Sequence, residues 1–222
     1  MTKRAVKGAS GIEKINGYLI PSTSPVFNDF RFLIQAETRD ETRYFMSGVH
    51  VEREGKKTFY VCTDGRRLHK LEYENHDIDL QPGDYDIRAC KAGLILCPKK
   101  EKTDFPNWRG VIPTDNKKHF TFEFSSNGKD NTVSHELFLF YEAIGGVVNM
   151  AFFEPLRDPL CSKWEVSFRD GNSAIIFKAR IRTAVIMPLQ REDAIQVRDD
   201  SNIIAIPAPA TQGVKIKAKK TA

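Results

Sequence analysis

The sequence predicts an α+β fold in which two units repeat the order strand, helix and several antiparallel strands. Three observations support this prediction. Residues 119–124 alternate polar and aromatic side chains, as a half-buried strand does. Apolar residues recur at helical spacing in two segments, each between an early strand and a series of later strands. The two units share this pattern but no sequence identity, so the repeat is one of architecture.

The first unit is expected over residues 17–104 and begins with a short strand at 17–21. Ser24 and Pro25 supply a helix cap and a proline at the first helical position, and the helix is expected to reach about Glu41. Its apolar stripe contains Phe27, Phe30, Leu33 and Ile34. Further strands are expected at 43–52, 57–62, 68–73, 84–89 and 93–97, with an Asp64-Gly65 turn before the third and with His69 on a strand surface.

The second unit is expected over residues 119–190, after a proline-flanked connector at 105–118. Its first strand covers 119–124, and Ser134 caps a helix that Gly145 and Gly146 end. The remaining strands are expected at 147–153, 163–169, 174–179 and 182–187.

Basic segments lie at both ends of the chain. Residues 1–16 are predicted to form a flexible basic arm, and residues 191–222 a polar tail tipped with lysines. Such tails are either simply solvated or contact nucleic acid, and the sequence leaves both interpretations open. The candidate nucleic-acid-binding residues are Lys215, Lys217, Lys219 and Lys220.

Composition limits the class of protein. The 222 residues are 41 % hydrophobic and 28 % charged, which is typical of a soluble globular protein, and no apolar run has membrane-spanning or signal-peptide character. We therefore expect a cytoplasmic protein. The four cysteines form no CxxC pair and should be free thiols, and no metal-ligand spacing occurs. Since phosphate loops and nucleophile–base pairs are also missing, we expect neither an enzyme nor a cofactor.

Three segments together resemble the bacterial DNA polymerase III β sliding clamp family. Residues 43–49 and 62–68 are similar to the family's RYxLNGV…ATDGHRLA, residues 105–113 to FPDYRRVIP, and residues 185–190 to its C-terminal VVMPMRL. They occur in the family's order, and the likeness extends over roughly residues 17–190. The resemblance implies a shortened clamp-like protein, for which a phage or mobile element is a candidate source.

In that family these segments form a hydrophobic cleft for the short linear peptides of polymerases and clamp loaders. Apolar side chains for burial, an adaptable methionine, a glycine and arginines would suit such a ligand. The alternative for Val185 and Met187 is that they are plain strand core. By resemblance, the peptide-binding residues are Met46, Thr63, Gly65, Arg66, Arg67, Leu68, Pro106, Val111, Val185, Met187, Pro188 and Leu189.

The resemblance implies a DNA replication accessory protein that gives a polymerase processivity. We expect a homo-oligomer, with double-stranded DNA as a candidate further partner. The alternative is a clamp-derived module that binds docking peptides without encircling DNA. Charge favours this alternative, because the first expected helix has four exposed acids against two bases and the second has Glu136 and Glu142 but no Lys or Arg. The family's His after TDG is Arg66 here, and 32 residues follow Gln190, where the family's chain normally ends.

Overall fold

The computed structural model describes residues 17–38, 40–74, 78, 80–101, 103–116, 118–124, 144–158 and 160–189. The chain divides into two compact units, of which the first joins Met1–Ile112 to Lys178–Ile186 and the second joins Pro113–Phe177 to Met187–Ala222. The segment Lys178–Ile186 thus belongs to the first unit, although we expected it within 119–190. The predicted arm, all but the end of the second helix, and the tail with its four lysines lie outside the described residues.

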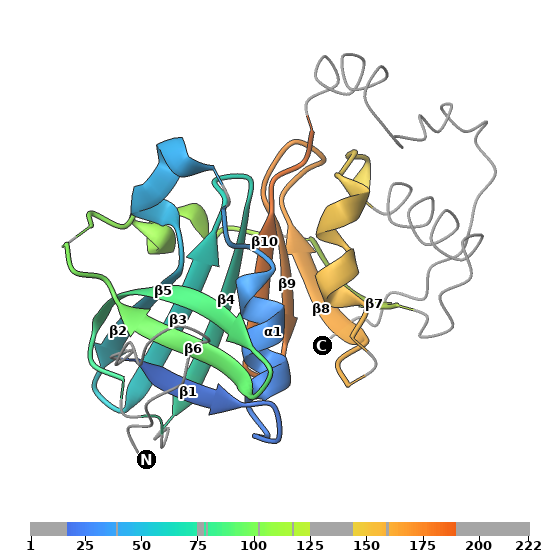
Figure 1. Cartoon of the computed structure of the whole chain (residues 1–222). Coiled ribbons are helices and arrows are strands. Elements are labelled where there is room, and N and C mark those ends of the chain that lie inside the picture. The colour runs from blue at the N-terminus through green and yellow to red at the C-terminus, as the bar shows by residue number, and fades with distance from the viewer. Residues whose placement is uncertain are drawn as a thin grey trace, which may run out of the picture. The chain divides into compact units, whose positions relative to one another are not determined.

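Seven strands of the first unit lie side by side in the order β1-β6-β5-β2-β3-β4-β10 (Figure 1). Each of the neighbouring pairs is antiparallel, which confirms the predicted α+β class with antiparallel strands. Six of the seven differ from the predicted ranges by one residue at one or both ends, whereas β2 begins six residues later than expected and ends two residues later. The strands are β1 (Tyr18–Pro21), β2 (Val49–Glu54), β3 (Lys57–Thr63), β4 (Arg67–Glu74), β5 (Gly83–Cys90), β6 (Gly93–Pro98) and β10 (Arg182–Ile186).

Helix α1 (Phe27–Ile34) packs on one face of this sheet, over β3 and β4 (Figure 1). Phe30 and Phe32 are buried there, and the rings of Phe30 and Tyr60 make a T-shaped contact with their centroids 5.0 Å apart. The predicted N-terminal cap is wrong, because Ser24 lies in a turn and its carbonyl accepts the amide of Phe27. The helix also ends seven residues earlier than expected. The amides of the next three residues bond to carbonyls three residues back, which tightens the backbone into a 3₁₀ turn.

Two segments predicted as strand are short helices instead. Residues 43–46 belong to the 3₁₀ helix η1 (Glu41–Met46), because the Asp40 carboxylate accepts the amide of Thr42 at 2.9 Å and caps its start. Residues 147–153 contain only a β-bridge at Val147, followed by η3 (Met150–Phe152) and η4 (Glu154–Leu156). Side-chain capping favours this outcome too, since the Asn149 side chain accepts the amide of Ala151.

The second unit has its own apolar core. Its strands β7 (Lys118–Glu123) and β8 (Lys163–Phe168) are antiparallel, and β9 (Ile175–Ala179) follows β8 in the strand order. The first three residues of β9 belong to this unit and the last two to the first unit. Trp164 is fully buried, and its indole N–H donates to the Leu156 carbonyl at 2.9 Å. This bond fixes η4 against β8.

Polar groups are buried between α1 and the sheet of the first unit. Arg182 donates to one Asp29 oxygen at 2.7 Å and Tyr73 donates to the other at 2.8 Å, so one helix carboxylate ties together β10 and β4. His69, predicted on a strand surface, is fully buried, and its ring stacks on Phe32 at 4.3 Å. Its Nδ1 donates to the Phe32 carbonyl, whereas its Nε2 has no hydrogen-bond partner among the described residues.

Burial lowers the pKa of His69 from 6.5 to about 3, and the nearby Arg67 and Arg182 charges act in the same direction. Below pH 6.5 the His69 imidazole therefore binds a proton in the unfolded chain but stays neutral in the folded chain. The free energy of unfolding falls as the pH falls from 6.5 toward 3. For one such proton the slope of the free energy of unfolding against pH is at most about 1.4 kcal/mol per pH unit.

We expect urea unfolding between pH 6.5 and 5 to show that the free energy of unfolding falls more steeply with falling pH in the wild type than in His69→Gln. An equal dependence of the free energy of unfolding on pH in the two proteins would contradict a neutral, buried His69.

Candidate functional site

The turn between β3 and β4 is fixed by its own side chains. The Thr63 hydroxyl accepts the Gly65 amide at 3.1 Å and donates to the Arg67 carbonyl at 2.7 Å. One Asp64 oxygen accepts the amides of Arg66 and Arg67, each at 2.9 Å, and the other accepts the Arg67 Nε at 3.0 Å. Gly65 has φ +84°, a conformation that glycine adopts without strain. The sequence motif therefore folds into a rigid turn that presents the exposed Arg66.

The register of three strands places apolar and hydroxyl groups beside this turn. Thr63 pairs with Leu68 across β3 and β4, and Leu68 pairs with Val185 across β4 and β10. Directly opposed residues of antiparallel strands lie on the same face, so these three side chains form one row. Leu68 is 3 % exposed and Val185 is 1 % exposed. Leu68 and Val185 are therefore buried beside the turn and do not form an exposed apolar surface.

Helix η1 brings two further side chains to the turn. Arg43 Nη1 donates to the Asp64 carbonyl at 2.9 Å, and its Nε lies 3.6 Å from an Asp40 oxygen. A Cβ atom built on Gly65 would lie 3.6 Å from the terminal methyl of Met46 and 3.1 Å from Arg43 Nη1. Met46 is buried and lies beside the turn. Arg43 was not among the predicted site residues, although it begins the first motif and that position could have identified it.

The connector lies on the same sheet face as Thr63 and Leu68. His50 pairs with Val61 and Glu52 with Phe59, so these residues alternate in phase with Thr63. The Phe105 ring stacks on His50 at 4.5 Å.

The short helix η2 (Trp108–Val111) continues the connector across this face. The Trp108 ring packs 5.6 Å from that of Phe59, and its N–H donates to Glu52 at 3.2 Å. Arg109 lies over the Trp108 ring at 4.5 Å and pairs with Glu52 and Glu54, which fastens the helix to β2. Val111, the last residue of η2, is 43 % exposed.

The structure thus brings nine of the twelve predicted site residues into one unit, on or beside one sheet face. The other three belong to the second unit and follow Ile186 directly in the chain. Among these, Met187 is 39 % exposed, and the Leu189 amide donates to the Val147 carbonyl at 2.7 Å. The nine are Met46, Thr63, Gly65, Arg66, Arg67, Leu68, Pro106, Val111 and Val185, and the three are Met187, Pro188 and Leu189.

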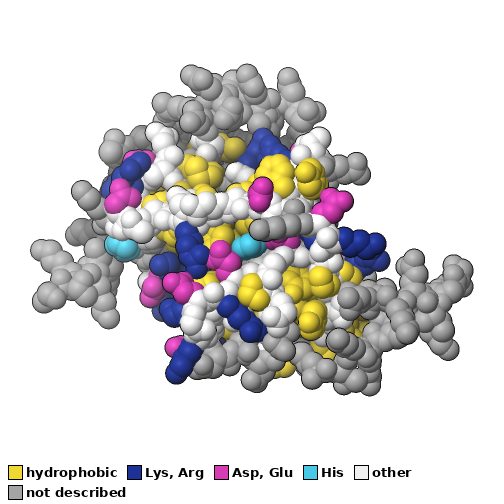
Figure 2. All heavy atoms as spheres, turned by 90° about the vertical axis from the view of Figure 1, so that its left-hand side faces the viewer, with side chains coloured by type: hydrophobic (Ala, Val, Ile, Leu, Met, Phe, Trp, Pro, Cys, Tyr) yellow, Lys and Arg dark blue, Asp and Glu magenta, His cyan; other side chains and the backbone are white. Residues whose placement is uncertain are grey.

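Charge near the turn is largely compensated locally. Arg43 and Arg67 each face an aspartate of their own segment, whereas Arg66 makes no ion pair with another described residue. On the molecular face in Figure 2, Lys and Arg side chains lie interspersed with Asp and Glu. Within the described ranges, no three His, Cys, Asp or Glu residues gather as a metal site requires. In that same part of the chain, no helix has the length and apolar character needed to cross a membrane.

Solved bacterial sliding clamps match this fold. DNA polymerase III subunit beta of Borrelia burgdorferi, solved with a natural product, matches with TM-score 0.53 and 13 % identity over 79 % of this chain and 64 % of that one. The beta chain of Streptococcus pneumoniae DNA polymerase III gives TM-score 0.53 and 11 % identity over 86 % and 69 %. The Helicobacter pylori beta clamp, bound to a DNA ligase peptide, gives 0.50 and 11 % over 84 % and 73 %.

These matches establish that the chain has the sliding-clamp fold, as the three motifs predict. The chain spans about two thirds of the length of these clamps, 64 % in the Borrelia burgdorferi protein. No protein-family profile and no curated protein matches the sequence.

The backbone of the turn gives a direct test of its construction. Gly65→Ala places a side chain at φ +84°, where the new Cβ would also press on the Arg43 guanidinium at 3.1 Å. We expect the free energy of unfolding to fall by about 1 to 2 kcal/mol, because alanine is strained in this region. Urea denaturation measures the change. Gly110→Ala is the matched control, since Gly110 has no positive φ and its nearest neighbour would lie 3.5 Å away. Equal effects of the two substitutions would show that the turn is not constrained as described.

Proposed function

We propose that this protein is a clamp-like DNA replication accessory that docks polymerases or other partners through a short peptide. The observation that carries the proposal is that Met46, the 63–67 turn, Leu68, Val185 and the connector lie on or beside one sheet face within a sliding-clamp fold. A Helicobacter pylori clamp of this fold is bound to a DNA ligase peptide. Processivity, DNA encirclement, homo-oligomerisation, a cytoplasmic location and the lack of enzymatic activity belong to this proposal as well.

The chemistry of the face suits an apolar peptide with acidic or carbonyl groups. Val111 and Met187 offer exposed apolar surface, and burying it on binding contributes about 25 cal/mol per Å². Met46 has three rotatable bonds, so its buried side chain can repack beside the 63–67 turn when a ligand arrives. The exposed guanidinium of Arg66, which makes no ion pair with another described residue, can meet a carboxylate or carbonyl of the peptide. Met187, Pro188 and Leu189 complete the proposed set because they follow β10 directly in the chain.

Exposed apolar residues allow the site to be tested without disturbing the core. We expect Val111→Ser with Met187→Ser to raise the dissociation constant for the Helicobacter pylori DNA ligase peptide about tenfold, as the loss of apolar anchors does. Fluorescence anisotropy of the labelled peptide measures the effect. Leu160→Ser is the control, because Leu160 is 67 % exposed but is not one of the proposed site residues. An unchanged dissociation constant in the double variant, or an equal loss in the control, would contradict the assignment.

The second candidate function is an interaction module that binds such peptides without encircling DNA. Charge favours it, because α1 carries only one base, Arg31, beside Asp29, and the face in Figure 2 mixes both signs. Retention on nicked circular DNA, followed by release when that DNA is cut, would support encirclement. A protein that binds the peptide but is not retained on the circle would support the module.

A further inference from the structure

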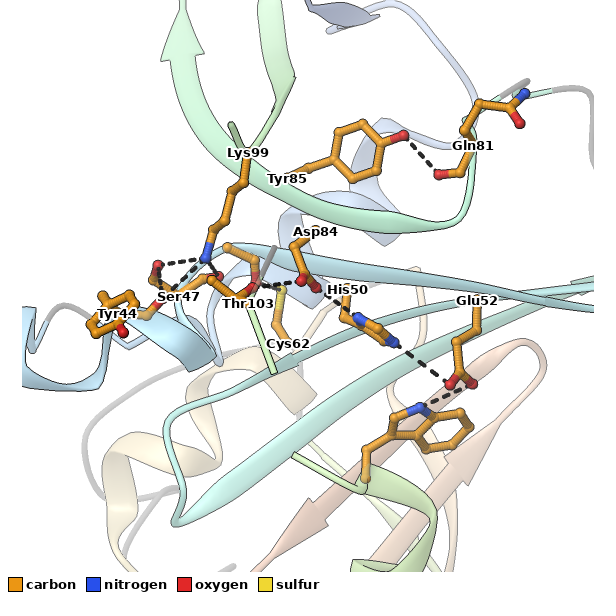
Figure 3. A network of polar contacts seen from close by, with 12 residues as sticks. Tyr44, Ser47, His50, Glu52, Cys62, Gln81, Asp84, Tyr85, Lys99 and Thr103 are labelled. Carbon is orange, nitrogen blue, oxygen red and sulfur yellow. Dashed lines mark hydrogen bonds and ion pairs between the residues drawn. The ribbon is translucent and has the colours of Figure 1, made fainter. Parts of the chain in front are cut away.

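We propose that Lys99 is a positioning residue for the peptide-binding surface, holding η1 so that Arg43 and Met46 stay against the 63–67 turn. This inference rests on the proposed function. The Lys99 Nζ donates to the Tyr44 carbonyl at 3.0 Å, the Ser47 carbonyl at 2.8 Å and the Ser47 hydroxyl at 3.0 Å (Figure 3). An ammonium group has three protons, and these three acceptors use all of them.

The hydrogen bonds of Lys99 lie at the C-terminal end of η1. The last carbonyls of a helix have no partner within it and carry partial negative charge. Helix η1 is also short and is interrupted at Arg43, whose φ of −110° and ψ of 33° are not helical. The amide of Ser47 bonds back to Tyr44, so a single ammonium holds both ends of this last turn. Removing it leaves the Ser47 carbonyl to water and the Tyr44 carbonyl with only the Ser47 amide and hydroxyl as donors, which loosens the end of the helix.

Lys99 itself is held in place by the sheet. It follows β6, and its amide donates to the Asp84 carbonyl on β5 at 2.9 Å. The Asp84 carboxylate accepts His50 Nδ1 at 2.7 Å and the Thr103 hydroxyl (Figure 3). Since His50 also stacks on Phe105, the same network also supports the connector. Lys99 is therefore anchored to a network that also holds the connector, which carries Pro106 and Val111.

The surface it supports is formed by η1 on one side and the turn on the other. Arg43 reaches the Asp64 carbonyl, and Met46 lies against Gly65. Both side chains project from the segment whose end Lys99 holds. A shift of η1 would move them together, so a peptide that contacts Met46 should bind more weakly without touching Lys99.

The experiment compares Lys99→Met with Lys100→Met, the neighbouring exposed lysine, and with Lys99→Arg, which keeps the charge and donors. We expect Lys99→Met to raise the dissociation constant for the Helicobacter pylori DNA ligase peptide about tenfold. Lys99→Arg should restore most of the affinity, and Lys100→Met should leave it unchanged. Amide hydrogen exchange of residues 42–48, measured without peptide, should speed up in Lys99→Met alone.

The two readouts separate failure of the inference from failure of the proposed function. Faster exchange in Lys99→Met together with unchanged peptide affinity would overturn the positioning role. Unchanged exchange would also overturn it, whatever the affinity. A wild-type protein that fails to bind the peptide would instead contradict the proposed function, while the exchange data would still report whether Lys99 holds η1.

Discussion

The register of β4 between β3 and β10 is the constraint on which the first unit depends. Antiparallel pairing sets Leu68 opposite both Thr63 and Val185, and a slip of one residue would move every side chain of β4 to the other face. The Asp64-Gly65 turn, closed by its own hydrogen bonds, sets the β3–β4 register, whereas the β4–β10 register joins residues more than a hundred positions apart. The Arg182–Asp29–Tyr73 contacts on the helix face support the same register.

This register decides which side chains of the sheet pack under α1 and which face the connector. One face buries Tyr60, His69 and Arg182 under α1, where polar groups are tied to the helix. The other face carries the connector, which is held by aromatic stacking on His50 and by the Glu52 pairs. The proposed peptide-binding surface thus combines the buried side chains of Leu68 and Val185 with the exposed side chains of Arg66 and Val111.

The sequence indicates the strands well because their alternation is local. It fails at residues 43–46, which alternate like a strand but become η1 because Asp40 caps them and Lys99, more than fifty residues later, holds their end. The polar character of His69 suggested a surface position, and its burial follows from α1 packing over β4, which no local pattern reveals. The motifs did identify residues that converge at the turn. Their exposure, with Leu68 buried and Val111 open, depends on tertiary packing and was not predictable.

The central claim is that a peptide docks on the connector face of β3, β4 and β10. The most direct measurement is photo-cross-linking of the Helicobacter pylori DNA ligase peptide, with a diazirine on one of its apolar residues, followed by mass-spectrometric mapping. The account predicts cross-links to Met46, to residues 106–111 and to Met187. Cross-links confined to α1 or to β1 would contradict it, as would labelling that an excess of unmodified peptide does not suppress.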